Sequence, residues 1–237
     1  MSDSLVIIPT YNEKDNIEKM IDTVFSLPKE FHLLIVDDNS PDGTAQLVKT
    51  YQKKYPEKLF LIERKGKLGL GTAYIEGFKW ALERHYEYVF EMDADFSHNP
   101  EDLIRLYKAC AEGNADVAIG SRYVKGGKVE NWPVTRIMMS YFASVYVRMI
   151  LWMNIKDTTA GFVCYKRKVL ETINLEKIRF IGYAFQIEMK YTAWLHGFKL
   201  VEIPITFKDR EIGQSKMSTK IFKEAFWGVL IIRGKEL

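Results

Sequence analysis

The sequence predicts an α/β protein built on a twisted, mostly parallel β-sheet with helices on both faces. Short β-rich runs alternate with helical patterns through residues 1–120, and turn-forming residues separate them. This alternation is typical of βαβ units, whose crossover helices cover the sheet. The chain has 237 residues, of which 47% are hydrophobic, enough to bury a sizeable core.

Five strands and four helices account for the first half of the chain. The strands are aliphatic or β-branched runs, expected at residues 5–8, 32–36, 59–62, 88–92 and 116–119. The helices have apolar residues at helical spacing, and are expected at residues 15–25, 43–55, 71–84 and 100–111.

The rhythm changes after Gly120. A glycine turn at residues 126–127 precedes a long apolar helix at 135–153, a mixed region and a strand at 200–207. A final amphipathic helix is expected at 219–232. No repeat or low-complexity linker divides the chain, so we expect residues 1–237 to form a single domain.

Polar residues cluster where three of the predicted strands end. The clusters span residues 9–13, 37–44 and 93–95. Ligands of parallel α/β sheets bind beyond the carboxyl ends of the strands. The three clusters therefore predict one binding site at that edge.

Asp93 and Asp95 follow a predicted apolar strand and stand two residues apart. Side chains two apart on a strand point the same way, so both carboxylates can project together. Mg²⁺ binds one or two protein carboxylates and completes its octahedron with water and substrate phosphate oxygens. This favours a phosphorylated substrate. The alternative is that the two acids merely end a strand in a solvated loop.

Composition excludes several classes of protein. The net charge of +3 and pI near 8.6 are too mild to indicate nucleic-acid binding. Cys110 and Cys164 lack metal-ligand spacing and lie in apolar runs, so we expect buried reduced thiols and a cytoplasmic location. Residues 137–155 are interrupted by Arg148 and fall short of a membrane span. Residues 66–71 lack the Gly-Lys-Ser/Thr ending of a P-loop, and the first strand lacks a dinucleotide fingerprint.

Five motifs, in order, carry a resemblance to a known family. They lie at residues 8–13 (IPTYNE), 36–44 (VDDNSPDGT), 92–100 (MDADFSHNP), 120–123 (GSRY) and 209–216 (DREIGQSK). With them the chain resembles the family 2 glycosyltransferases of GT-A fold, and among these the polyprenyl-phosphate mannose synthases, also called dolichol-phosphate mannosyltransferases. The resemblance covers most of the chain.

The resemblance implies roles for individual residues. Guanosine would be held by Pro9, Tyr11, Glu13, Val36 and Asp38. The metal and the sugar nucleotide would be held by Asp93, Ala94 and Asp95, with Asp93 and Asp95 as the metal ligands. Phosphates would be held by Arg122, Arg210 and Lys216, and the residues carrying catalysis would be Asp95, Arg122, Arg210 and Lys216. Some relatives have Gln where this chain has Ser97, so water can take a third ligand position here.

The implied reaction is transfer of mannose from GDP-mannose to a polyprenyl phosphate, with inversion and with Mg²⁺ or Mn²⁺. Residues 1–120 would form mainly the nucleotide-sugar half, residues 121–217 mainly the acceptor half, and residues 218–237 the amphipathic C-terminal helix. The enzyme would work peripherally at the cytoplasmic face of a membrane, alone or with a membrane-anchoring partner protein. Residues 208–223 carry five cations against only two acids. The cations are Lys208, Arg210, Lys216, Lys220 and Lys223, and the acids are Asp209 and Glu211. This excess of positive charge independently favours an anion there, and a solvated charged loop is the alternative.

Other functions remain open. The donor could be another sugar nucleotide such as UDP-glucose, the acceptor a protein or polysaccharide, or the chain a non-catalytic nucleotide-sugar sensor. Helix 135–153 is either a core helix or an interfacial element that receives the lipid. Gln186 and Glu188 are weak candidates on the acceptor side, and His98 is expected to serve local hydrogen bonding. Burial is expected for Trp132, Trp152, Trp194 and Trp227.

Overall fold

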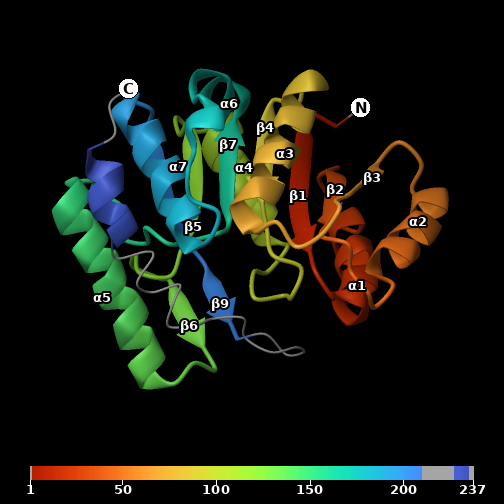
Figure 1. Ribbon diagram of the computed structural model, residues 1–237, viewed down its shortest axis with the longest axis horizontal. Coiled ribbons are helices and arrows are strands. Elements are labelled where there is room, and N and C mark those ends of the chain that lie inside the picture. The colour runs from red at the N-terminus through yellow and green to blue at the C-terminus, as the bar shows by residue number, and fades with distance from the viewer. Residues whose placement is uncertain (1, 210–226, 235–237) are drawn as a thin grey trace.

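A computed structural model of the chain describes residues 2–209 and 227–234 (Figure 1). The first-half elements agree with the sequence prediction to within two residues at each end. They are β1 (Ser4–Thr10), α1 (Lys14–Phe25), β2 (His32–Asp37), α2 (Thr44–Lys54), β3 (Leu59–Glu63), α3 (Leu70–Glu83), β4 (Tyr88–Glu91), α4 (Asp102–Ala111) and β5 (Val117–Ser121).

The second half contains more elements than its sequence indicated. They are β6 (Lys128–Glu130), α5 (Val134–Leu151), β7 (Val163–Lys166), α6 (Arg167–Thr172), a short 3₁₀ helix (Leu175–Lys177), α7 (Tyr183–Leu195), β8 (Leu200–Pro204) and β9 (Thr206–Lys208). Residues 227–233 are helical, and the rest of the predicted final helix lies outside the described residues. The predicted strand at 200–207 is two strands, because β8 pairs with β5 whereas β9 pairs with β6.

Seven strands form the central sheet in the order β3-β2-β1-β4-β7-β5-β8. All neighbours are parallel except β7, which runs antiparallel to both β4 and β5. The prediction of a mostly parallel sheet is therefore confirmed. β7 went unpredicted because its four residues lie in a mixed region with no turn signal to separate them from the helix that follows.

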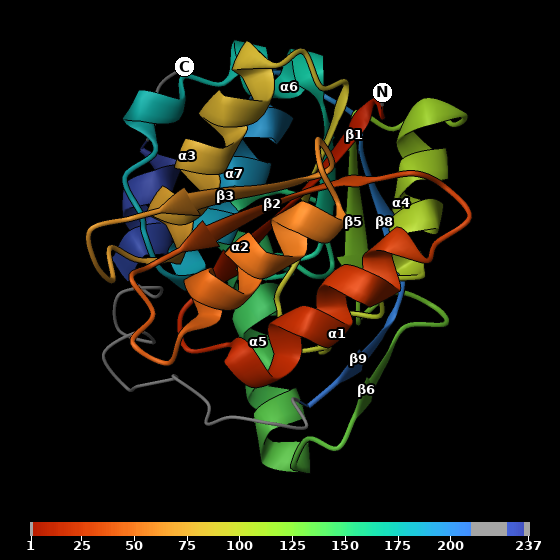
Figure 2. The same cartoon turned by 90° about the vertical axis from the view of Figure 1, so that its right-hand side faces the viewer.

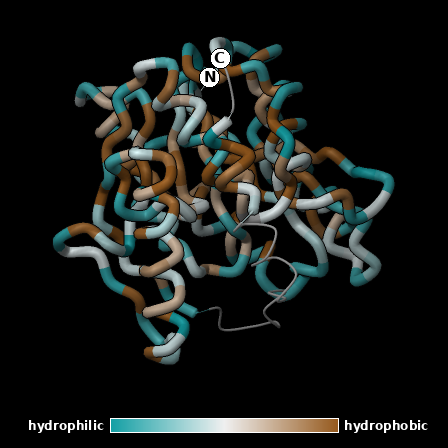
Figure 3. Tube along the Cα trace, turned by 60° about the vertical axis from the view of Figure 1, so that its left-hand side comes forward, coloured by the Kyte–Doolittle hydropathy of each residue, from teal (hydrophilic) through white to brown (hydrophobic). Residues whose placement is uncertain are grey.

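Alternate residues of β1 feed two cores, one on each face of the sheet. Val6 and Ile8 pack with α1, α2 and α4, whereas Leu5 and Ile7 pack with α3, α6 and α7. Figure 2 shows the two helix layers on either side of the strands, and Figure 3 shows hydrophobic residues concentrated in the interior. The prediction of helices on both faces is correct, and strand alternation is the reason.

Glycines allow close packing at the start and middle of α3. The Gly71 amide donates to the Ile181 carbonyl oxygen at 2.9 Å, and a Cβ on Gly71 would lie 2.8 Å from the Phe180 carbonyl oxygen. Gly69 has φ +104°, a conformation that side chains disfavour. These glycines therefore let the start of α3 pack closely against the loop before α7.

Three predictions about burial are wrong. Trp152 is 77% exposed, Trp227 is 64% exposed and Trp194 is 38% exposed, although burial was expected for all three. Trp152 is the C-cap of α5 and has a left-handed backbone (φ 57°). Cys110 and Cys164 are buried and free, as predicted.

We expect Phe78→Ala to lower the free energy of unfolding by about 3–5 kcal/mol, because the ring is fully buried and its loss leaves a cavity. The Phe78 ring packs edge-on against Tyr165 of β7, with centroids 5.6 Å apart. Urea denaturation measures the change. Glu83→Ala is the control, since Glu83 is exposed on the same helix and its loss should change stability by less than ~0.5 kcal/mol. Equal effects of the two changes would contradict this account of the core.

Candidate active site

A cavity of about 990 Å³ opens at the carboxyl edge of the sheet. The turns after β1, β2 and β4 contribute to its wall, as the three polar clusters predicted. The predicted residues that line it are Pro9, Tyr11, Glu13, Asp38, Asp93, Ala94, Asp95 and Arg122. The structure thus brings together residues that are more than 100 positions apart in the sequence.

Asp93 and Asp95 follow β4 and both line the cavity. The Asp93 side chain is 39% exposed, whereas Asp95 is buried and accepts a hydrogen bond from the Ser97 amide at 3.1 Å. Phe96 lies between Asp95 and Ser97 and has φ 58°, a strained conformation for an aromatic residue. The turn is therefore held in a shape that an ordinary loop would avoid.

His98 supports this turn from below. Its ring is buried, stacks on Phe162 with centroids 4.9 Å apart, and its Nδ1 lies 3.4 Å from the Asp93 amide nitrogen. Burial lowers the pKa of His98 to about 4, so the ring is neutral at neutral pH and Nδ1 can accept that N–H. The expected local hydrogen-bonding role fits this geometry.

The donor set suits a hard divalent cation. Within the described part of the chain, no group of three or more His, Cys, Asp or Glu side chains could hold a metal ion. The two carboxylates would therefore leave several coordination positions for water and phosphate oxygens, which is the pattern of Mg²⁺ and Mn²⁺ sites in phosphate chemistry. Asp93 and Asp95 fit such an ion.

The side of the cavity formed by the turns after β1 and β2 contains a charge pair that the sequence did not indicate. The Asp38 carboxylate accepts hydrogen bonds from Arg64 Nε at 2.5 Å and from the Leu68 amide at 3.2 Å. Arg64 is buried and also donates to the Gly69 carbonyl oxygen. Asp38 is thus hydrogen-bonded to the loop before α3. Its remaining oxygen lone pairs are available to accept hydrogen bonds from a ligand.

An aromatic ring and an ammonium lie together beside that pair. The Lys67 ammonium lies 4.6 Å from the centroid of the Tyr11 ring. Both residues line the cavity, so this end of it offers a flat ring beside a cation.

Arg122 forms an ion pair with the buried Asp157 carboxylate, which offsets its positive charge. Its Nε and Nη2 donate to the two carboxylate oxygens of Asp157 at 2.7 and 2.6 Å, and its Nη2 also donates to Thr159 at 2.9 Å. Burial alone would raise the pKa of Asp157, but the Arg122 guanidinium lowers it below the usual range. Asp157 is therefore ionised, and the pair is close to neutral overall.

One predicted residue does not line the wall, and two others lie outside the described residues. The Val36 side chain is fully buried in the core that α3 covers, so contact with guanosine would have to come from its main chain. Arg210 and Lys216 lie outside the described residues, as does most of the basic loop. Glu188 accepts hydrogen bonds from the amides of Arg179 and Phe180, so it serves the loop before α7.

The far wall of the cavity is aromatic and apolar. Trp132 lines it, and the Arg136 guanidinium stacks on the Trp132 ring at 3.9 Å from the centroid. The remaining surface comes from α5 and from residues 227–229, through the side chains of Met139, Ser140, Ala143, Tyr146, Val147, Trp227 and Val229. Arg136 therefore faces the cavity.

Two ionisable side chains are buried beneath the cavity floor. Glu91 of β4 and Lys190 of α7 are both fully buried. Burial raises the pKa of Glu91 to about 8, although the Lys190 ammonium opposes the shift, and burial lowers the pKa of Lys190 to about 8. The sequence could have flagged Glu91, since an acid inside an apolar strand is unusual, whereas nothing marked Lys190 as buried.

The similarity to known proteins agrees with this geometry. The model of the family described as glycosyl transferase family 2 matches residues 5–173, more than half of the chain. The chain belongs to glycosyl transferase family 2. The predicted family is thereby confirmed, and the protein is a glycosyl-transferring enzyme by family.

This glycosyltransferase has close relatives across its whole length. It is 47% identical over 231 residues to the polyprenol monophosphomannose synthase of Mycolicibacterium smegmatis, covering 95% of this chain and 87% of that protein. It is 44% identical over 230 residues to the undecaprenyl-phosphate mannosyltransferase of Micrococcus luteus, covering 95% and 93%. It is 40% identical over 224 residues to the dolichol-phosphate mannosyltransferase of Pyrococcus furiosus, covering 92% of this chain and 60% of that protein.

Solved structures support the fold. A mannosyltransferase from Pyrobaculum calidifontis, in complex with GDP-Man and Mn²⁺, matches with a TM-score of 0.61 at 16% identity, covering 97% of this chain and 69% of that one. A glucosyl-3-phosphoglycerate synthase from Mycobacterium tuberculosis matches with a TM-score of 0.71 at 15% identity, covering 97% and 78%. The GT-A fold predicted for this family 2 glycosyltransferase is confirmed.

We expect His98→Asn to weaken the acid sensitivity of the fold. An exposed imidazole has a pKa of ~6.5, whereas folded His98 titrates near 4. Between these values the unfolded chain binds a proton that the folded chain does not, so stability falls as pH drops from about 6.5 to about 4. Asn keeps an acceptor for the Asp93 amide but does not titrate in this range. Urea denaturation across the range should give a shallower loss for the variant.

The control is His85→Asn, because His85 is exposed and Asn tolerates its left-handed backbone. It should leave the pH profile of stability unchanged. A wild-type slope in H98N would show that His98 does not titrate as its burial implies.

Proposed function

We propose that this glycosyltransferase transfers mannose from GDP-mannose to a polyprenyl phosphate with inversion. One observation carries the proposal: a single cavity joins the polar turns after β1, β2 and β4 to an apolar wall on α5. The polar end suits a nucleotide sugar, and the apolar end suits a lipid. The relatives named as mannose synthases of polyprenyl-type phosphates favour mannose as the sugar.

The nucleotide would occupy the polar end. Tyr11 offers a flat aromatic surface next to the Lys67 ammonium. Glu13 and Asp38 supply acceptors for base and ribose donors, and Asp38 is oriented by Arg64. The diphosphate would then lie toward Asp93 and Asp95, which hold the metal ion. When bound, a divalent cation there stabilises the charge that develops on the departing diphosphate.

The acceptor needs little activation by the protein. A phosphate monoester has a second pKa near ~6, so it is largely dianionic at neutral pH and attacks C1 without a general base. Binding and orientation are therefore the main tasks of this end of the cavity. Arg136 lies in the described wall, where its guanidinium pairs with the Asp209 carboxylate at 3.2 Å, and the basic loop with Arg210 and Lys216 would supply further positive charge.

The exposed face of α5 suits a lipid surface. Its exposed large apolar side chains are Val134, Met138, Met139, Tyr141, Phe142 and Met149. Only Ser144, Val147 and Leu151 are buried against the protein. Among the described residues, α5 is also long and apolar enough to cross a bilayer by length and composition, which corrects the expectation that no segment would be.

We favour an arrangement in which α5 lies in the membrane interface, because its buried face belongs to the protein core and its residues line the cavity. The polyprenyl chain would then enter the cavity directly from the bilayer. Free buried cysteines and a nucleotide-sugar donor favour the cytoplasmic face. A membrane-anchoring partner is needed only if the chain alone does not bind lipid.

The decisive assay measures transfer of labelled sugar to a short polyprenyl phosphate with Mg²⁺ or Mn²⁺. We expect mannosyl lipid from GDP-mannose, its loss on chelation, and far less product from UDP-glucose. Glucosyl lipid would reassign the donor. Donor binding without product from either nucleotide would contradict the proposed reaction.

Asp95→Asn serves as the active-site variant in this assay. It should lower kcat by at least about a hundredfold at saturating metal, because it removes a charged ligand next to the leaving group. Asp15→Asn is the matched control, an exposed aspartate on α1 outside this cavity. Full turnover by D95N would remove Asp95 from the metal site.

Flotation with phospholipid vesicles tests the membrane face. The double change Phe142→Ser and Met149→Ser should reduce binding at least about tenfold, since it removes two large apolar side chains from the proposed contact. Trp194→Ser is the control, because Trp194 is exposed on α7 outside the cavity wall. No flotation of the wild-type chain would indicate dependence on an anchoring partner, and equal losses in both variants would contradict the assignment of α5.

A further inference from the structure

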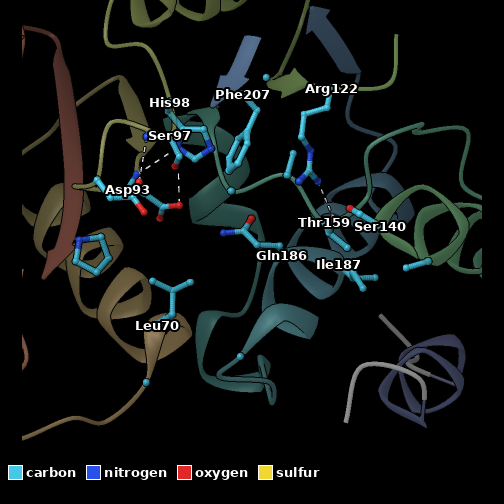
Figure 4. A pocket seen from close by; sticks show the side chains of 18 of the residues that line it. Leu70, Asp93, Ser97, His98, Arg122, Ser140, Thr159, Gln186, Ile187 and Phe207 are labelled. Atoms are coloured by element: carbon cyan, nitrogen blue, oxygen red, sulfur yellow. Dashed lines mark hydrogen bonds and ion pairs between the residues drawn. The ribbon is translucent and has the colours of Figure 1, made fainter. Parts of the chain in front are cut away.

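The Gln186 side chain occupies a position in the cavity that the residues assigned above leave unexplained. It comes from the first turn of α7, is only 2% exposed and lines the cavity. Figure 4 shows its amide in the middle of the view, between the turn that carries Asp93 and the segment that carries Thr159. A buried amide in a cavity wall needs hydrogen-bond partners.

The buried ammonium of Lys190 fixes which end of that amide faces which way. Lys190 Nζ donates to Gln186 Oε1 at 3.2 Å, to the Gln186 carbonyl oxygen at 3.1 Å and to the Ala160 carbonyl oxygen at 2.6 Å. An ammonium has three donors and no acceptor, so it selects the oxygen of the amide and rejects its NH₂. The Nε2 group is left on the other side.

The Nε2 group carries two N–H donors. One of them is directed at the buried Glu91 carboxyl, because a hydrogen bond from Gln186 opposes the rise that burial causes in the pKa of Glu91, although no acceptor lies at ordinary hydrogen-bond geometry among the described residues. Nε2 also lies close to Gly161, since a Cβ on Gly161 would be 3.8 Å from Nε2. Gly161 lines the cavity and leaves open space next to the amide, where the second N–H can meet a ligand. A purely structural role for the amide, as a donor to Glu91 alone, is the alternative.

The position of the sugar follows from the proposed reaction, on which this inference rests. In an inverting displacement the nucleophile, C1 and the leaving oxygen lie roughly in line. The leaving diphosphate belongs beside Asp93 and Asp95, and the acceptor phosphate belongs toward Arg136. The sugar ring must then lie between these two ends, which is the part of the cavity that Gln186 faces.

We propose that Gln186 is a specificity residue for the transferred sugar, with Nε2 donating a hydrogen bond to one sugar hydroxyl. Lys190 is a positioning residue that holds the amide in the donating orientation. A site built to hydrogen-bond a hydroxyl discriminates strongly against a substrate that lacks it, because its buried donor is then left unpaired.

The test combines Gln186→Met with GDP-mannose and its 2-, 3-, 4- and 6-deoxy analogues. The wild type should lose about tenfold to a hundredfold in kcat/KM on one particular deoxy donor. Q186M should lose a similar factor on GDP-mannose itself. For Q186M with that one deoxy donor, the fall in kcat/KM should be no larger than the fall caused by the mutation alone or by the deoxy donor alone. The reason is that both changes remove the same hydrogen bond.

GDP binding separates the sugar contact from damage to the fold. GDP has no sugar to transfer, so Q186M should bind it as tightly as the wild type does. Gln46→Met is the matched control, an exposed glutamine on α2 whose loss should change neither activity nor GDP affinity. If Q186M does not fold, Gln186→Glu serves instead, because it keeps the shape and the contact with Lys190 but removes the donor, and the same pattern is expected.

Two results would overturn the inference. One is a Q186M loss that multiplies with the loss on every deoxy donor, and the other is an equal loss of GDP affinity. Either would assign Gln186 a structural role beside Glu91. Failure of the wild type to transfer mannose would overturn the proposed function instead, so the two failures are distinguishable.

Discussion

The candidate site depends on the antiparallel pairing of β7 between β4 and β5. Val163 of β7 lies opposite Glu91 on one side and Ile119 on the other. Because β7 runs against its neighbours, the segment before it starts at the carboxyl edge, where the turns after β4 and β5 end. Residues 157–161 are thereby placed between the turn carrying Asp93 and the turn carrying Arg122. A parallel strand here would have put that segment at the opposite edge.

Two buried ion pairs fix the geometry of the site and neutralise charged side chains that face the cavity. Asp38 pairs with Arg64, and Arg122 pairs with Asp157. Each pair connects two loops that are distant in sequence, and each neutralises most of the charge of the member that faces the cavity. Such pairs add less to stability than their Coulomb energy suggests, because both ions are desolvated. Their value here is that they hold acceptor and donor groups in one geometry before a ligand arrives.

The cavity resolves the problem of joining a water-soluble donor to a lipid acceptor. Its polar end is formed by turns of the central sheet, and its apolar end by α5 and residues 227–229. α5 can leave most of its apolar side chains exposed because only a narrow face is needed for packing. An exposed apolar face of this kind is costly in water and favourable at a membrane interface. The same helix thus provides both the cavity wall and the proposed contact with lipid.

The sequence by itself determined the alternating strands and helices, the acidic and polar turns at their ends, and the family. These features are local, because period-two and helical patterns and short motifs are written in neighbouring residues. Sequence reasoning could also place Asp93, Asp95, Tyr11 and Asp38 at one edge, since parallel strands share it. The short β7 carried no clear local signal, and it remained unrecognised.

Only the tertiary structure decided the partners of these residues. The sequence suggested that Arg122 would serve phosphates, but folding gives it Asp157 as a bidentate partner 35 positions away. Val36 matched a nucleotide motif, but strand alternation directs its side chain into the core. Gln186 gained significance only because Lys190 is buried beneath it. Long-range pairing, burial and the electrostatic environment depend on which elements pack together, and no local pattern encodes that.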